Sequence, residues 1–379
     1  MTRPGRRLRY MLLFLLLVVT AAAGVSRIAN PFGIWRSFTV DKIYLKEIKA
    51  PRVSMPYRLR REQPSTLIVG SSRTLDGMPI EYGHRDGVLN ASLPGATLDE
   101  IAFIIKVAIE RSRPTRLIWG VDFYAFDENQ AGFRDSETRL RLEGDTRLLI
   151  VESLLSMETF ELSRKLLARA IAGQKGLSPE RELPVPWSEQ DIRASIADPG
   201  KIGLDRRDRV AITASLKTWT DLYSNYRFSD RLFALYRSAV AHARQAGIEV
   251  ILYVPPLNRY ELEIIRQTGR WETFQRWKRQ LLTVGPYWDF SGYNELSRSD
   301  PLFSDPVHFK PVVGHAILRQ ILGKGCAECG DRAQVVADAG VWVSAETVDR
   351  HLAAQTLDGF SPAQPDLRYS TLVEGVLRQ

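Results

Sequence analysis

The sequence predicts an α/β protein with a doubly wound, parallel sheet of five strands. Short β-branched runs alternate with helical segments of about 10 or more residues. Such alternation requires right-handed crossovers, which give a mostly parallel sheet with helices on both faces. The chain has 379 residues, of which 44% are hydrophobic and 25% charged. This composition is typical of globular proteins, and the length allows one large domain or two smaller ones.

The predicted strands are residues 65–70, 88–92, 116–122, 248–254 and 287–290. The first of them, Ser-Thr-Leu-Ile-Val-Gly, is the most uniformly apolar. A strand covered on both faces has this composition, so we expect it to lie between the second and third strands.

The predicted helices are residues 97–111, 230–246 and 259–282, with a short strand at 341–343 and a capped helix at 344–355 appended to the core. Thr97 followed by Glu100 is typical of a capping box, and Gly247 is typical of a helix end.

The predicted organisation has four parts. Residues 1–30 form a membrane anchor or signal segment, 31–64 a lead-in, 65–325 the α/β domain and 326–379 a C-terminal appendage. A large insertion with helical periodicity at its centre, residues 123–229, follows the third strand. Loops that leave the carboxyl ends of strands surround the ligand site in open α/β sheets. We therefore expect the insertion to form a lid or helical subdomain over the site; the alternative is a peripheral decoration.

The formal net charge of +8 does not indicate a nucleic-acid-binding protein. Half of it comes from Arg3, Arg6, Arg7 and Arg9, which precede the uncharged run Tyr10–Val25. A basic flank before an apolar run targets the chain to the inner membrane and keeps its N-terminus cytoplasmic. We expect the body to be periplasmic.

The apolar run is compatible with two fates. Its 16 residues are close to the roughly 17 needed to span a bilayer. The small residues Ala21–Ala23 also fit a signal-peptide cleavage site. We expect an uncleaved anchor, with cleavage as the alternative.

The sequence predicts neither a metal site nor a cofactor. Its two cysteines, Cys326 and Cys329, cannot make a four-ligand zinc site, and there is no phosphate-binding loop or dinucleotide fingerprint. In an oxidising compartment we expect a local disulfide between them; two free thiols are the alternative.

The first candidate for chemistry is the serine pair in Gly70-Ser71-Ser72-Arg73. A serine just past the carboxyl end of a strand is exposed to the crevice where ligands bind. It also lies beside unpaired backbone N–H groups. This position suits a nucleophile, although a serine there also caps the following turn in many proteins.

The second candidate is Asp305-Pro-Val-His308, after the last predicted strand. The carboxylate of Asp305 can hold Nδ1 of His308, leaving Nε2 free to take a proton from a serine hydroxyl. Because the first and last strands end in one crevice, we expect the hydroxyl of one of the two serines within about 4 Å of His308 Nε2.

The order of these residues resembles that of the SGNH hydrolase superfamily, the GDSL-like lipases and esterases. Its extracytoplasmic acyl-transfer branches include alginate-acetylation and D-alanyl transfer proteins. The resemblance extends from Thr66 to Leu322, excluding the insertion. It implies a flavodoxin-like fold in which Ser72 is the nucleophile, His308 the base and Asp305 its orienting partner. Gly95 corresponds to the glycine that donates a backbone N–H to the oxyanion.

The third motif of the family departs from the pattern. The family has an amide where this chain has Asp122. An ionised carboxylate cannot donate to an oxyanion, which leaves the N–H groups of Ser72 and Gly95 unless Asp122 is protonated. Asp122 could instead hold a sugar hydroxyl or be satisfied by a neighbouring turn. Arg73 could hold a substrate carboxylate or pair with Asp76 or Asp122, and we expect the internal pair.

The resemblance implies a membrane-tethered periplasmic O-acyltransferase or esterase. Its substrate would be the acyl, above all acetyl, groups of an envelope or exported polysaccharide. The expected partners are that polysaccharide or an acyl sugar and the inner membrane; a membrane-bound acyl donor protein is compatible with this reading. The alternative is a non-catalytic protein that binds glycan or serves as a scaffold in a polysaccharide export complex.

Overall fold

The computed structural model describes residues 3–30, 49–78, 87–133, 151, 154–171, 206–299, 302–323 and 332–355. The chain divides into two compact units. The first comprises Met1–Gln63, Glu81–Arg85 and Asp135–Glu182, and the second Pro64–Ile80, Asp86–Arg134 and Leu183–Gln379. Cys326 and Cys329 lie outside the described residues, so the predicted disulfide stays a prediction.

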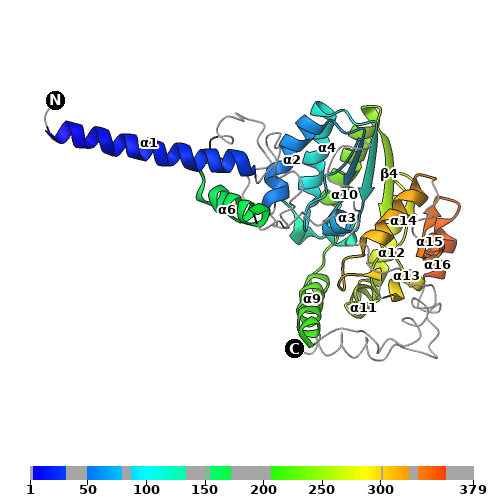
Figure 1. The fold of residues 1–379 in the computed structure, drawn as a ribbon. Helices are drawn as coiled ribbons and strands as arrows, with labels where there is room; N and C mark the ends of the chain where they lie inside the picture. The colour runs from blue at the N-terminus through cyan, green and yellow to red at the C-terminus, as the bar shows by residue number, and fades with distance from the viewer. Residues whose placement is uncertain are drawn as a thin grey trace. The chain divides into compact units, whose positions relative to one another are not determined.

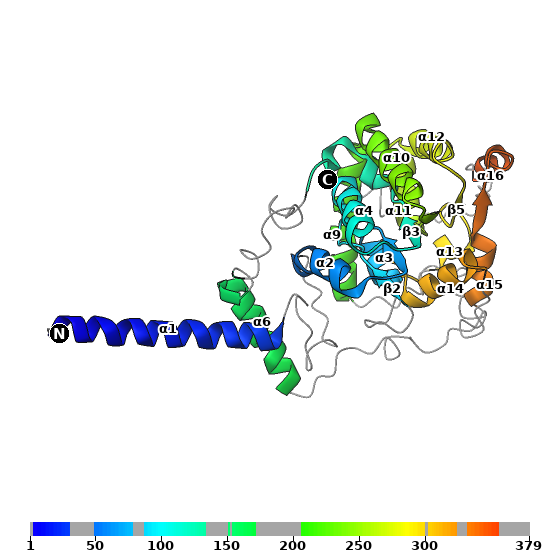
Figure 2. The same ribbon diagram turned by 90° about the horizontal axis from the view of Figure 1, so that it is seen from above.

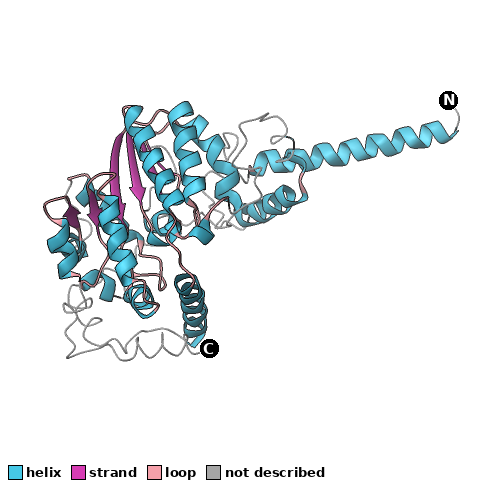
Figure 3. Cartoon of the chain, turned by 180° about the vertical axis from the view of Figure 1, so that it is seen from behind, coloured by secondary structure: helices cyan, strands magenta, loops and turns pink. Residues whose placement is uncertain are grey.

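The second unit is mixed α/β, built on a six-stranded, mostly parallel sheet (Figures 1 and 3). The strands are β1 (Thr66–Val69), β2 (Val88–Asn90), β3 (Arg116–Gly120), β4 (Glu249–Val254), β5 (Tyr287–Asp289) and β6 (Val341–Val343). Their order is β2-β1-β3-β4-β5-β6, and only β6 is antiparallel to its neighbour. The sheet has one strand more than the predicted five, because the appended segment pairs with β5 through Trp288 and Trp342.

The first strand lies where the sequence predicts. It pairs in parallel with β2 on one side and with β3 on the other, so that Leu67 is opposite both Leu89 and Leu117. Its side chains Leu67, Ile68 and Val69 are buried. A parallel interior strand therefore ends at Val69, and only Gly70 separates it from the serine pair.

Helices connect and flank these strands. In the second unit they are α3 (Ser72–Gly77), α4 (Leu98–Arg111), α9 (Arg206–Ser224), α10 (Asp230–Gln245), α11 (Arg259–Gln267), α12 (Trp271–Leu281), α13 (Glu295–Arg298), α14 (Pro311–Ile321), α15 (Arg332–Ala339) and α16 (Val348–Ala354), with the 3-10 turns η1 (Phe123–Phe126) and η2 (Glu128–Gln130). α4 packs beside α10, and α14 packs against both α3 and α15 (Figure 2).

The single helix predicted for residues 259–282 is wrong, because Gly269 divides it into α11 and α12. Gly269 has a φ of +72°, a left-handed conformation that glycine adopts without strain. Its N–H donates to the Arg266 carbonyl, and the N–H of Arg270 donates to the Ile265 carbonyl. This pair of bonds is a Schellman motif, which ends α11 before α12 begins.

The predicted capping box begins α4. Thr97 Oγ1 accepts from the Glu100 N–H at 3.2 Å, and Glu100 Oε2 accepts from the Thr97 N–H at 3.1 Å. Thr97→Ala is expected to lower the free energy of unfolding by about 1 kcal/mol, because it leaves an N–H of the first turn unpaired. Denaturant unfolding measures this loss. Thr97→Ser keeps the hydroxyl and serves as the control; equal losses in both variants would contradict a capping role.

A buried ionic cluster holds α16 to the sheet. Lys278 Nζ lies 2.8 Å from Asp289 Oδ2, which also lies 2.8 Å from His351 Nε2. Burial opposes the charge of Asp289, but Lys278 and His351 outweigh it and lower the pKa of this carboxyl. Gln355 accepts from Lys278 Nζ and donates to the Ser291 carbonyl. α16 is therefore fastened to β5 through side chains that share no sequence pattern.

The first unit contains α1 (Arg3–Ala29), α2 (Lys49–Glu62) and α6 (Met157–Ile171). Residues Arg7–Ala29 of α1 are long and apolar enough to cross a membrane. Large side chains along α1, among them Phe14 and Leu17, are exposed. The end of α1 packs against α6, whose Leu162 is buried, so part of the large insertion folds with the N-terminal helix.

Candidate active site

Ser72, His308 and Asp305 form a continuous chain of hydrogen bonds. Ser72 Oγ lies 2.8 Å from His308 Nε2, well inside the expected 4 Å. His308 Nδ1 lies 2.7 Å from Asp305 Oδ2. A serine, an imidazole and a carboxylate in this order can move a proton from the hydroxyl to the ring while the carboxylate fixes the ring tautomer.

The two serines after β1 have different partners. Ser71 is the N-cap of α3, and its Oγ accepts from the Arg73 N–H at 3.2 Å. Ser72 is the first residue of α3 and turns its hydroxyl to His308. Each serine therefore fulfils one of the two expectations: Ser71 caps α3, and Ser72 hydrogen-bonds the imidazole of His308.

Local hydrogen bonds hold the loop that carries the imidazole. Asp305 Oδ1 accepts from the N–H groups of Val307 and His308 at 2.8 and 2.9 Å. Burial acts to raise the pKa of Asp305, but His308 and these two N–H groups outweigh it and lower the pKa. The stabilisation that these bonds give is present above the unfolded pKa of about 3.9 and is lost as the pH falls through the lower folded value. Asp305 therefore keeps its charge at neutral pH.

Close packing of α3 against α14 fixes the distance between Ser72 and His308. α3 begins at Ser72, and α14 begins three residues after His308. The helices meet at Gly77 and Gly314, where a Cβ on Gly314 would overlap the carbonyl oxygen of Gly77. Only glycine at position 314 permits this approach, which holds the serine and the imidazole in reach of each other.

Two backbone N–H groups lie at the mouth of the site. Gly95 is in a turn in which the Ala96 N–H donates to the Leu93 carbonyl, and its φ of +57° favours glycine. Gly95 and Ser72 both line one pocket. Within the described part of the chain, neither N–H has a hydrogen-bond acceptor. They are therefore free to donate to a ligand oxygen.

Arg73 is buried and joins four elements around the site. Its guanidinium donates to Asp122 at 2.6 Å and to Glu261 at 2.5 Å, and its Nε donates to the Val307 carbonyl at 3.2 Å. Burial acts to lower its pKa, but Glu261 and Asp122 outweigh this effect and raise it. The expected internal pair of Arg73 exists, and Asp122, not Asp76, is its partner in that pair.

Glu261 and Tyr223 were missing from the sequence prediction. Tyr223 donates its hydroxyl to Glu261 Oε1 at 2.7 Å. Burial raises the pKa of Glu261, against the opposing effects of Arg73 and Tyr223. Glu261 lies 188 residues from Arg73 in the chain and in the first turn of α11, where an acidic residue is ordinary. No local pattern distinguishes it from a residue that only stabilises the helix.

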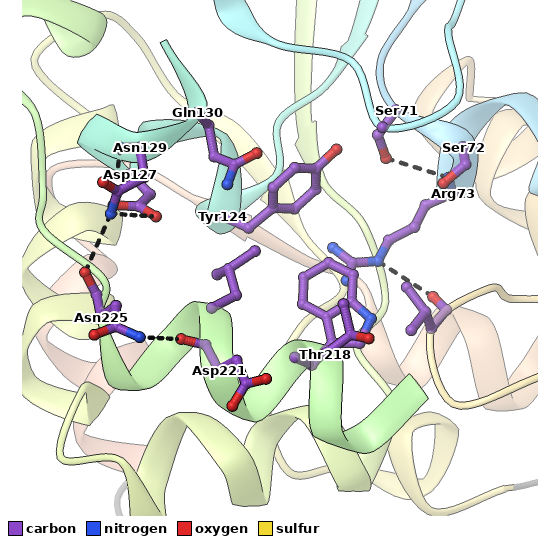
Figure 4. Close-up of a pocket in the computed structure, with 14 residues that line it drawn as sticks. Ser71, Ser72, Arg73, Tyr124, Asp127, Asn129, Gln130, Thr218, Asp221 and Asn225 are labelled. Atoms are coloured by element: carbon purple, nitrogen blue, oxygen red, sulfur yellow. Dashed lines mark hydrogen bonds between the residues drawn. The ribbon is translucent and has the colours of Figure 1, made fainter. Parts of the chain in front are cut away.

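A pocket of about 480 Å³ adjoins Ser72. Figure 4 shows Ser71, Ser72 and Arg73 at one end and Asp127, Asn129 and Asn225 at the other. The walls come from the β1–α3 turn, from η1 and η2, and from the last turns of α9. Both ends of the large insertion thus line the pocket, whereas Asp122 does not line it.

Comparison with protein-family models, curated proteins and solved structures finds no match to this chain. Among the described residues, no group of three or more His, Cys, Asp or Glu side chains is placed to hold a metal ion.

Proposed function

We propose that the protein is an SGNH-like serine acyltransferase or esterase. The observation that carries this proposal is the hydrogen-bonded series Ser72–His308–Asp305 at the mouth of a pocket. Ser72 Oγ attacks the acyl carbonyl carbon while His308 Nε2 takes the hydroxyl proton and then gives it to the departing oxygen. A sugar hydroxyl or water next attacks the acyl-serine and gives its proton to His308 Nε2, which passes it to Ser72 Oγ as the bond between Oγ and the acyl carbon breaks.

The strand order supports the flavodoxin-like part of this proposal. The order β2-β1-β3-β4-β5 is that of flavodoxin-like doubly wound sheets. The chain moves from β1 to β2 in one direction and from β2 past β1 to β3 in the other. Right-handed crossovers then place α3 and α4 on opposite faces. In such folds the ligand lies beyond the carboxyl ends of the strands, where Ser72 follows β1.

The oxyanion would be stabilised by the backbone N–H groups of Ser72 and Gly95. Asp122, at the position of the family's amide, accepts from Arg73 and does not line the pocket. A missing oxyanion donor typically costs about 2.7–4 kcal/mol of transition-state stabilisation. The missing donor would make hydrolysis slow. Because the pocket walls come from the insertion and could hold an acceptor sugar, we favour acyl transfer over hydrolysis.

The location that we propose is the inner membrane, with α1 as the single span and the body in the periplasm. Four arginines precede the apolar run, and the bias of basic residues keeps that side cytoplasmic. A periplasmic body would meet envelope or exported polysaccharide, and we propose its acyl groups as the substrate. A membrane-bound acyl donor protein is compatible with this arrangement.

Labelling with a fluorophosphonate tests the proposal on the full-length protein in detergent. Such a reagent phosphonylates serines that are activated by a histidine. The expected result is one added mass on the peptide that contains Ser72. Ser71→Ala should retain the label and Ser72→Ala should lose it. Absence of both labelling and acetyl ester turnover would contradict catalysis and favour the non-catalytic glycan-binding alternative.

A further inference from the structure

The pocket beside Ser72 has an acidic lining. Its described lining residues include two carboxylates, Asp127 and Asp221, and one cation, Arg73. The charge of Arg73 is already matched by Asp122 and Glu261, which lie 2.6 and 2.5 Å from its guanidinium. The lining therefore has no positive charge left over for an anionic ligand.

Asp221 is the carboxylate that a ligand can reach. Asp127 is buried and accepts from Asn129 and from the Arg227 N–H. Asp221 is exposed, and no described residue donates a hydrogen bond to its carboxylate. Figure 4 shows Asp221 projecting from α9 on the wall of the pocket.

The end of α9 adds to the negative potential. Thr218, Asp221 and Leu222 belong to the last turns of this helix, where the macrodipole is negative. Lys217, which does not line the pocket, is exposed on α9 one turn before Asp221, and two arginines on neighbouring segments are engaged. Arg270 donates to the carbonyls of Tyr223 and Ser224, and Arg227 pairs with Glu128 at 3.1 Å.

The rest of the lining suits a sugar ring. Tyr124 and Trp219 supply aromatic surface, and Gln130, Asn129 and Thr218 supply polar groups. A volume of about 480 Å³ is within the range of small-molecule sites. Aromatic surface with a few convergent polar groups favours a ligand with an apolar ring face and several hydroxyls.

We infer that the pocket takes a neutral or amino-bearing sugar unit and rejects a sugar carboxylate, with Asp221 as a specificity-determining residue. This inference rests on the proposed action on polysaccharide and narrows its substrate class. A uronate would place its carboxylate beside Asp221 and the end of α9, and like charges in an interface oppose binding.

Binding to the full-length Ser72→Ala protein in detergent tests the inference without requiring turnover. The probes are methyl glucoside, methyl glucosaminide and methyl glucuronide, titrated by ligand-observed NMR. The neutral and amino glycosides are expected to bind more tightly than the glucuronide. Asp221→Asn should tighten glucuronide binding about three- to fivefold, the upper part of the range for one exposed charge interaction, and change methyl glucoside binding less than twofold.

The control is Glu272→Gln, which removes an equal charge from an exposed position on α12 outside the pocket lining. It should change none of the three affinities. Glucuronide binding as tight as that of the neutral glycoside would overturn the inference, as would an Asp221→Asn variant with unchanged selectivity. If all three glycosides fail to bind the Ser72→Ala protein while Ser72 of the natural protein is labelled by the fluorophosphonate, the inference is overturned and catalysis stands. Selective binding without labelling would support the inference and refute catalysis.

Discussion

Turnover of an aryl acetate is expected to fall by about 10⁴-fold or more when His308 is replaced by alanine. Among the described residues, the His308 imidazole is the side chain that hydrogen-bonds Ser72 Oγ. Without it, the hydroxyl must lose its proton to water. Ser72→Ala should cause a similar loss. The double variant should be no slower than either single one, because residues that act as a unit are not additive.

Initial rates with purified full-length protein measure this effect, and His242→Ala is the matched control. His242 is exposed on α10 and takes no part in the site, so its loss should leave turnover within twofold. A His308→Ala protein that kept more than about a tenth of the activity would remove the imidazole from the mechanism. Asp305→Ala should cost less than His308→Ala, since the half-exposed carboxylate can be replaced in part by water.

The sequence was sufficient to predict the parts of the site that depend on strand ends and local spacing. Ser72 directly follows an apolar parallel strand, and Asp305 and His308 share a short loop. Strand ends of a parallel sheet meet at one edge, so the approach of Ser72 and His308 follows from the winding.

The interactions that depend on tertiary packing could not be predicted in this way. Glu261 pairs with Arg73 because α11 packs beside α9 and the site, and its helix-start position carries no sign of this. The break at Gly269 was missed because the hydrophobic periodicity continues across it from α11 into α12. The sixth strand required knowing that residues 341–343 return to pair with β5.

Arg73→Met is expected to lower the free energy of unfolding by about 3–5 kcal/mol, the usual cost of removing one partner from a buried ion pair. The variant keeps much of the side-chain volume but leaves Asp122 and Glu261 buried without their cation. Denaturant unfolding of the full-length protein in detergent measures the loss. Arg73→Met combined with Glu261→Gln should recover part of it, because one buried charge is then removed. Equal stability of Arg73→Met and the natural protein would show that the buried pairs contribute nothing.

The pH dependence of this loss distinguishes buried charge from lost packing. Burial already raises the pKa of Glu261, and Arg73 opposes that rise. Removing Arg73 raises this pKa further, so the folded variant binds a proton more readily than the unfolded chain. A carboxyl with a raised folded pKa is stabilising at low pH, and that contribution is lost as the pH rises through the folded value. The deficit of Arg73→Met should therefore be smaller at pH 5 than at pH 8. A stability deficit that does not change with pH would assign the loss to packing. Turnover of Arg73→Met at pH 8 should also fall, because the Val307 carbonyl beside His308 loses its hydrogen-bond donor.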